Sequence, residues 1–214
     1  MKQSVILFCG AFDPVHNGHI EMARAARDQF DATVIFIPTK TRATYYASTA
    51  DRINMLNLVC TENYGFKLST YELDNLDIPS MYDTVSHFLN DDTQLYLMLG
   101  ADQVNEFHEW HSADEIVKLA KICYAPRKDV VLDFHTIEKY KMQRIFVGTG
   151  SRESSTDVRN GSLNQVPKYI KDYIKKHKLY KVEKPVVKKA EAQSGVDISD
   201  DWEQPTQQEE ESDI

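Results

Sequence analysis

The residues of this chain best suited to chemistry lie between positions 10 and 19, directly after the first apolar run. The segment has the sequence Gly-Ala-Phe-Asp-Pro-Val-His-Asn-Gly-His, which places His16 and His19 three positions apart across the first turn of a predicted helix. Gly10 allows a ligand to approach the backbone, and N–H groups at a helix start attract anions. Two imidazoles at that end of a helix are poorly placed to carry positive charge by themselves. The pattern therefore predicts a phosphate-binding turn in which a polyphosphate supplies the opposite charge.

His16 and His19 also allow a simpler interpretation, in which they cap a helix or lie in solvent, as most isolated histidines do. The complete ten-residue pattern after a strand favours a binding site instead. It is neither a dinucleotide-binding G-x-G-x-x-G turn nor a P-loop, because the glycine spacing differs and the Gly-Lys-Ser/Thr sequence is absent.

A second candidate phosphate site lies at residues 154–159, which have the sequence Ser-Ser-Thr-Asp-Val-Arg. Hydroxyl groups at a helix start, with Arg159 one turn later, can cap the helix, bind phosphate or do both. Capping alone is the alternative for this motif.

A third candidate group lies between these motifs. The sequence Gly-Ala-Asp at 100–102 follows the most apolar run of the chain, and Trp110 comes shortly afterwards. Helix capping by Asp102 and core packing of Trp110 are the alternatives to ligand binding at these two positions.

The elements that must position these residues follow from the apolar pattern, which alternates between short strand-like runs and helical stretches. Strands are predicted at 4–9, 34–37, 66–69, 95–99, 121–125 and 144–147. Helices are predicted at 18–30, 81–89 and 113–120, from about residue 50 behind Ser48 and Thr49, and from Pro167 onward. This alternation predicts an α/β fold, a Rossmann-like doubly wound parallel sheet with helices on both faces. Ligands of such sheets bind beyond the carboxyl ends of the strands, which is where the first motif lies.

Charge is distributed unevenly along the 214 residues, which carry a formal net charge of −8. Residues 190–214 contain nine acidic side chains and no Lys or Arg, so the remainder has 24 acidic and 25 basic residues. A near-neutral body suits a small anionic ligand and lacks the basic excess of a nucleic-acid binder. We expect one domain at 1–183 and an acidic, disordered tail at 184–214, whose partner stays open.

Cys9, Cys60 and Cys123 are far apart in the sequence and lie among apolar neighbours. Reduced, packed thiols fit this arrangement better than disulfides or a zinc site, so no metal ligands are predicted. No apolar run approaches the roughly 18 residues of a membrane span, and the start of the chain lacks a signal-peptide layout. The expected location is the cytoplasm, without a membrane partner.

The motifs together resemble a known family. The His-Asn-Gly-His sequence at 16–19 resembles the H-x-G-H signature of the nucleotidylyltransferase superfamily, and residues 154–159 resemble its S-S-T-x-x-R element. The Gly-Ala-Asp at 100–102 and the later Trp110 are similar to bacterial nicotinate-mononucleotide adenylyltransferases. The resemblance extends over residues 4–181. Class I aminoacyl-tRNA synthetases carry a related signature but are far longer.

This resemblance implies transfer of the adenylyl group of ATP to nicotinate or nicotinamide mononucleotide, giving deamido-NAD or NAD and pyrophosphate, with Mg²⁺ bridging the phosphates. It implies that Asp102 contacts a ribose hydroxyl and that Trp110 stacks on the pyridine ring. The catalytic residues implied are His16, His19 and Arg159. The residues implied to bind ATP are Gly10, Ala11, Phe12, His16, Gly18, His19, Ser154, Ser155, Thr156 and Arg159. Those implied to bind the mononucleotide are Ala11, Phe12, Lys40, Thr84, Gly100, Asp102, Trp110 and Arg127.

Two segments depart from the family pattern. The Pro-Pro-His-Lys element is absent after Pro38, where residues 39–46 are Thr-Lys-Thr-Arg-Ala-Thr-Tyr-Tyr, and Lys40 or Arg42 could replace the charge of the missing lysine. Residues 80–84, Ser-Met-Tyr-Asp-Thr, are one residue shorter than the family's Ser-Tyr-Thr-x-Asp-Thr loop. The preference between nicotinate and nicotinamide therefore stays open.

Two other functions fit parts of the sequence. One is nucleotidyl transfer to a different phosphate acceptor, as in pantetheine-phosphate adenylyltransferase or a cytidylyltransferase, although the Gly-Ala-Asp and Trp110 match disfavours it. The other is a catalytically weak nucleotide-binding or scaffold protein whose acidic tail recruits a partner. Whether the chain forms a homo-oligomer stays open as well.

Overall fold

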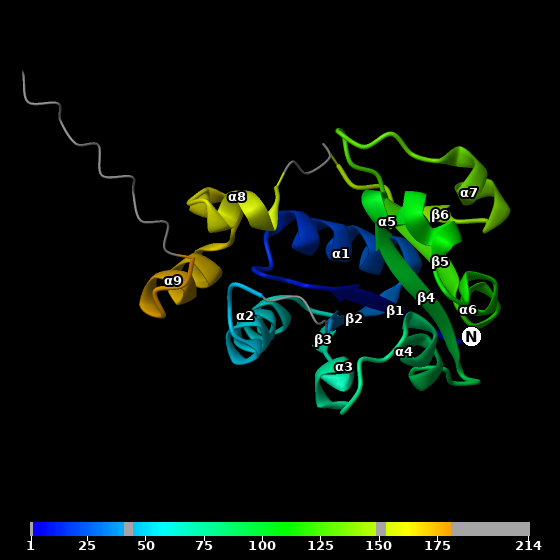
Figure 1. Ribbon diagram of the computed structural model, residues 1–214, viewed down its shortest axis with the longest axis horizontal. Helices are drawn as coiled ribbons and strands as arrows, with labels where there is room; N and C mark the ends of the chain where they lie inside the picture. Colours follow the sequence, from blue (N-terminus) through cyan, green and yellow to red (C-terminus); the bar gives the residue numbers. More distant parts are fainter. Residues whose placement is uncertain (1, 41–44, 149–152, 181–214) are drawn as a thin grey trace, which may run out of the picture. The chain divides into compact units, whose positions relative to one another are not determined.

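Six parallel strands form the sheet at the centre of the structure (Figure 1). The structure is a computed structural model that describes residues 2–40, 45–148 and 153–180, all within one compact unit at 1–182. The strands are β1 (Gln3–Gly10), β2 (Ala32–Pro38), β3 (Phe66–Leu68), β4 (Thr93–Gly100), β5 (Lys121–Ala125) and β6 (Gln143–Arg144). Their order in the sheet is β3-β2-β1-β4-β5-β6.

The first strand lies at the point where the chain changes direction across the sheet. Leu7 of β1 is in register with Ile35 of β2 on one side and with Leu97 of β4 on the other. The chain runs outward from β1 to β3, then returns to begin again at β4. Because the connections leave β1 and β4 toward opposite sides, a crevice opens at their carboxyl ends, the usual ligand site of such sheets.

Helices cover both faces of the sheet, which confirms the predicted doubly wound α/β fold. One apolar cluster joins the strands to α1 (Asn17–Phe30), α2 (Thr49–Thr61), α8 (Ser155–Arg159) and α9 (Lys168–Lys176). The opposite cluster joins them to α4 (Met81–His87), α5 (Ala101–Glu106), α6 (Ala113–Leu119) and α7 (Phe134–Lys139). The short helix α3 (Tyr71–Asp74) follows β3. Buried residues alternate between the two clusters along β1, as expected for a strand covered on both faces.

The predicted elements are present, with differences at their ends. The last strand stops at Arg144 instead of residue 147, because the N–H of Phe146 donates to the side chain of Gln29 at 2.9 Å and the Phe146 ring is exposed. The helix predicted to reach residue 89 stops at His87. Ser48 caps α2 as predicted, since its hydroxyl accepts the N–H of Asp51.

The short helices α3 and α7 were not predicted, because a turn or two of helix carries too little periodicity to recognise. The acidic tail at 184–214 lies outside the described residues, so the expectation for it stays a prediction.

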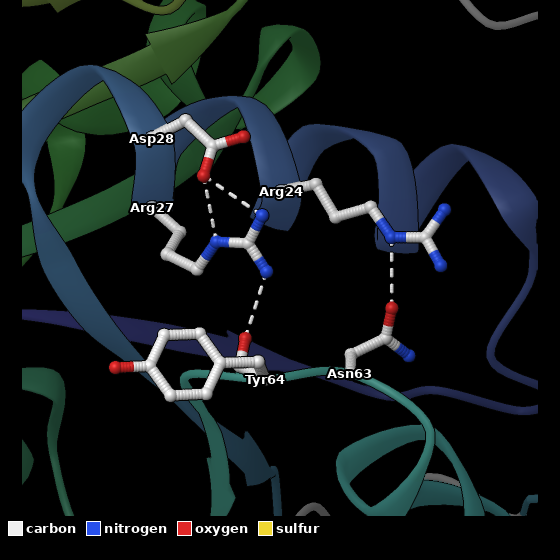
Figure 2. Close-up of polar contacts among 5 residues, drawn as sticks. All are labelled: Arg24, Arg27, Asp28, Asn63 and Tyr64. Atoms are coloured by element: carbon white, nitrogen blue, oxygen red, sulfur yellow. Dashed lines mark hydrogen bonds and ion pairs between the residues drawn. The ribbon is translucent and has the colours of Figure 1, made fainter.

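Helix α1, which carries the two histidines at its start, is fastened to the turn between α2 and β3 (Figure 2). Arg24 Nε donates to Asn63 Oδ1 at 2.8 Å, and Arg27 Nη1 donates to the carbonyl oxygen of Tyr64 at 2.8 Å. Asn63 is buried and also donates through Nδ2 to the carbonyl oxygen of Val59 at 2.7 Å. These bonds hold α1 against sliding along the sheet, and so they help to keep its first turn at the crevice.

Replacing Asn63 with Ala removes both side-chain bonds and leaves the buried carbonyl of Val59 without its donor. We expect the free energy of unfolding to fall by about 2 kcal/mol, measured by urea denaturation. Asn164→Ala, at an exposed asparagine, serves as the control and should change it by less than about 0.5 kcal/mol. Equal stability of the two variants would contradict this role of Asn63.

Candidate active site

A cleft of about 370 Å³ opens at the carboxyl ends of β1 and β4, within the size range of small-ligand sites. It brings together segments far apart in the sequence. The expected site residues that line it are His16, Gly18, His19, Gly100, Asp102, Arg127, Ser154, Ser155, Thr156 and Arg159. The two predicted phosphate motifs therefore face one cavity.

His16 and His19 lie against each other at the start of α1, with ring centroids 3.7 Å apart and ring planes 30° apart. The backbone N–H of His16 donates to Nδ1 of His19 at 3.3 Å. Because Nδ1 of His19 is thus an acceptor, the neutral ring carries its proton on Nε2 and is a hydrogen-bond donor there. Nδ1 of His16 is buried and has no hydrogen-bond partner among the described residues.

The surroundings of the two histidines disfavour positive charge. The pKa of His16 is lowered from 6.5 to about 4, mainly by burial and to a smaller extent by the charge of Arg127, with Glu153 and Asp157 opposing the shift. Burial, His16 and Arg127 together hold the pKa of His19 well below its ordinary value. Both imidazoles are therefore neutral near pH 7 until an anion enters the cleft and favours their protonated forms.

Phe12 forms the floor beneath the histidines. Its buried ring packs edge-on against Phe8 and His19, with both centroid distances at 5.2 Å. Its backbone is left-handed, with φ of 47°, an unusual conformation for a bulky residue that neighbouring structure must maintain. A Cβ added to Gly10 would lie 3.0 Å from this ring, which explains the glycine. The ring of Phe12 is thus not available to a ligand, whereas the neighbouring residue Ala11 is exposed.

Helix α8 is bonded directly to the turn between β1 and α1, and Figure 1 shows it beside the start of α1. Ser155 Oγ donates to the carbonyl oxygen of Pro14 at 2.9 Å, and Arg159 Nη1 donates to that of Asp13 at 2.7 Å. Arg159 Nη2 also donates to Thr156 Oγ1 at 2.8 Å. Ser154 caps the start of α8 and also lines the cleft, so the capping alternative and the cleft position both hold for this residue.

Asp102 and Arg127 lie on the β4 and β5 side of the cleft. Arg127 Nη1 is 3.6 Å from Asp102 Oδ2, and both side chains are partly exposed. The cap of α5 is Gly100, so the capping alternative for Asp102 is wrong. The Asp102 carboxylate, in the first turn of α5, is exposed enough to accept a hydrogen bond from a ligand hydroxyl as well.

Gly10 and five of the expected mononucleotide residues do not line the cleft. Two of the five are Ala11 and Phe12, in the turn after β1, and the other three lie elsewhere in the fold. Lys40 Nζ donates to the carbonyl oxygens of Asn75 and Leu76. Thr84 is fully buried and donates to Glu72. Trp110 is half-buried, with its ring centroid 5.2 Å from that of Phe107, as its core-packing alternative predicts. Arg42 lies outside the described residues.

Several residues that shape the site were missed by sequence reasoning. Asp13, although inside the first motif, was given no role, yet it is buried and accepts hydrogen bonds from Tyr46, Ala47 and Tyr180. Arg52 is also buried and donates to the carbonyl oxygen of Ala11 at 2.8 Å. The sequence could have indicated the role of Arg52, because this charged residue lies on the apolar face of the predicted helix.

The other chemical expectations concern thiols, metals and membranes. Cys9, Cys60 and Cys123 are free thiols, as predicted, and burial raises the pKa of Cys60 to about 12. Within residues 2–40, 45–148 and 153–180, no group of three or more His, Cys, Asp or Glu is placed to hold a metal ion. No helix in these same ranges has the length and apolar character needed to cross a bilayer.

A doubly wound sheet with paired histidines after β1 and a hydroxyl- and arginine-bearing helix at the same cleft defines a nucleotidylyltransferase-type α/β protein. Comparison with known proteins agrees, because the cytidylyltransferase-like family matches residues 7–161. The chain belongs to this family.

Its relatives include two proteins named "Probable nicotinate-nucleotide adenylyltransferase". That of Aquifex aeolicus is 38% identical over 132 residues, covering 59% of this chain and 79% of the relative. That of Clostridium botulinum (strain Alaska E43 / Type E3) is 30% identical over 192 residues, covering 81% of this chain and 96% of the relative. Plasmodium falciparum nicotinic acid mononucleotide adenylyltransferase, solved complexed with NaAD, has the same fold, with a TM-score of 0.70 at 17% identity. That likeness covers 83% of this chain and 97% of the other.

The buried histidines predict a pH-dependent stability. Because the pKa of folded His16 is near 4 and that of an unfolded histidine is near 6.5, the unfolded chain binds more protons between these values. Stability is therefore lost as the pH falls below about 6.5, and His16 alone contributes a loss of about 2 kcal/mol between pH 7 and pH 5. Urea unfolding should show this loss reduced by that amount in His16→Asn. An identical pH dependence in wild type and variant would contradict the burial of a neutral His16.

Proposed function

We propose that this chain transfers the adenylyl group of ATP to nicotinate mononucleotide, or to nicotinamide mononucleotide, giving deamido-NAD or NAD and pyrophosphate. The observation that carries the proposal is the convergence of both phosphate motifs on one cleft at the β1 and β4 ends. The names of the relatives support the same acceptor.

The reaction is an in-line displacement at the α-phosphorus of ATP. A phosphate oxygen of the mononucleotide forms the new P–O bond, and the bond to the β-phosphate oxygen breaks, so that pyrophosphate leaves with the electron pair. No covalent enzyme intermediate is required. Catalysis of such a transfer depends on positioning the two substrates and on neutralising the charge that develops on the phosphate oxygens.

The ATP side of the cleft supplies donors suited to this task. His19 donates from Nε2 to a phosphate oxygen, and His16 lies directly beside it. Arg159 and the first turn of α8 hold the β- and γ-phosphates. Neutral imidazoles are adequate donors, and they gain protons as the negative charge of ATP enters.

The acceptor side is assigned to the residues of the other wall. Asp102 accepts a ribose hydroxyl, and Arg127 offsets the charge of the mononucleotide phosphate. A main-chain contact of Ala11 and Phe12 with the same phosphate stays a prediction that rests on the family resemblance. Roles for Lys40, Thr84 and Trp110 in binding the mononucleotide stay predictions that rest on the family resemblance alone. Mg²⁺ would enter with ATP as part of the substrate, and it would neutralise part of the charge on the phosphate oxygens.

The test is pyrophosphate release from MgATP by the purified full chain, with nicotinate mononucleotide and nicotinamide mononucleotide in separate reactions. We expect release with at least one of them, and the ratio of kcat/KM values gives the pyridine preference. ATP binding without release in either reaction would overturn the proposed acceptor and favour another phosphate acceptor or a non-catalytic role.

His19→Ala should lower kcat by about 10²- to 10³-fold, because it removes a preorganised donor to the developing charge. The melting temperature should stay close to that of the wild type. His177→Ala, at an exposed histidine after α9, is the matched control and should retain full turnover. Near-normal turnover of His19→Ala would exclude His19 from the chemistry.

A further inference from the structure

Asp13 is a buried carboxylate in the turn between β1 and α1, with only 3% of its surface exposed. Its Oδ2 accepts the backbone N–H of Tyr46 at 2.7 Å, and its Oδ1 accepts that of Ala47 at 3.1 Å. Oδ1 also accepts the hydroxyl of Tyr180 at 2.6 Å. These three donors come from two segments far from Asp13 in the sequence, so the carboxylate joins both of them to the turn.

The same residue fixes the guanidinium of Arg159 from two sides. The carbonyl oxygen of Asp13 accepts Arg159 Nη1 at 2.7 Å. The ring of Tyr46, whose backbone is held by the Asp13 carboxylate, lies 4.6 Å from the guanidinium carbon. Displacement of Asp13 would therefore disturb both contacts of Arg159 at once.

Tyr180 reaches Asp13 from the last described segment of the chain. After α9, Lys178 and Tyr180 adopt left-handed backbone conformations, with φ of 55° and 54°, and this turn precedes the contact of the Tyr180 hydroxyl with Asp13. Burial and the Asp13 carboxylate raise the pKa of Tyr180 far above its ordinary value, so the hydroxyl remains a donor at any physiological pH. Helix α9 has its own anchors in Ile170 and Ile174, which are buried in the core.

We infer that Tyr180 is a positioning residue of the ATP-phosphate site, acting through Asp13 on the guanidinium of Arg159. The inference rests on the proposed function, since it takes Arg159 as a phosphate ligand. Without the Tyr180 hydroxyl, the Asp13 carboxylate loses a charge-assisted bond and is held only by the backbone N–H groups of Tyr46 and Ala47, so the turn is fixed less firmly. The ATP side of the cleft then loses order, whereas Asp102 and Arg127 on the other wall keep their contact.

The chain offers a matched control in Tyr173. This residue also belongs to the carboxyl-terminal segment, and its hydroxyl donates to a carboxylate, Asp51 Oδ1, at 2.9 Å. The hydrogen-bond partners of this hydroxyl among the described residues, Asp51 and Asn54, both lie on α2. Tyr173→Phe therefore removes the same kind of bond without reaching the cleft.

The experiment compares Tyr180→Phe, Tyr173→Phe and wild type as full chains. ATP affinity is measured by calorimetry, KM for each substrate by pyrophosphate release, and stability by thermal melting. We expect Tyr180→Phe to weaken ATP binding and raise the KM for ATP about five- to tenfold, with the KM for the mononucleotide within about twofold of wild type. Tyr173→Phe should change neither affinity, although both variants lose some thermal stability.

Tyr46→Leu provides a second, independent variant, because the Tyr46 ring is exposed and its loss does not open the core. It should weaken ATP binding selectively as well, and its effect should be less than additive with that of Tyr180→Phe. Equal ATP affinity in Tyr180→Phe and Tyr173→Phe would overturn the inference, as would a uniform loss of affinity for both substrates. If wild type binds ATP but transfers nothing to either mononucleotide, the proposed function fails, while the ATP affinities still decide the role of Tyr180.

Discussion

The site depends above all on the hydrogen bond between Arg159 and the carbonyl oxygen of Asp13, which joins two segments that are 146 residues apart. Neither segment forms a phosphate site alone. The turn after β1 has imidazoles and backbone N–H donors but no permanently charged cation. Helix α8 has the cation of Arg159 but consists of little more than one helical turn. Together with the bond from Ser155 to Pro14, this contact turns two local motifs into one cavity wall. The buried carboxylate of Asp13 in turn requires its three donors, so the stability of the turn and the order of the cleft have a common origin.

Burial determines the electrostatic character of this wall. The two histidines lie in contact and are held neutral, so the free protein avoids two adjacent positive charges in a poorly hydrated place. In the proposed reaction, an entering polyphosphate supplies the missing negative charge and makes protonation of the histidines favourable. The same arrangement therefore keeps the histidines neutral in the free protein and prepares them to bind an anion. The backbone N–H of His16 bonds to Nδ1 of His19, so Nε2 of His19 is already oriented as a donor.

The acceptor side of the cleft differs from the ATP side in how it is built. Asp102 and Arg127 come from the ends of neighbouring strands, β4 and β5, and need no long-range network to meet. The segment after β2 instead uses Lys40 to hold the carbonyls of residues 75 and 76, while buried Glu72 binds both the backbone of Lys40 and the hydroxyl of Thr84. The two segments that depart from the family sequence are thus tied to each other through the carboxylate of Glu72.

The sequence by itself determined the sheet, its parallel order of strands and helices, and the two phosphate motifs, because apolar periodicity and helix-start residues act over a few neighbouring positions. Even some caps, such as Ser48 and Ser154, follow from such local signals. Only the tertiary structure decided where β6 ends, that Thr84 and Trp110 lie away from the cleft, and that Asp13, Arg52 and Tyr180 support it. The physical reason is that burial and long-range hydrogen bonds depend on which distant segments meet, and no spacing within a single segment encodes that meeting.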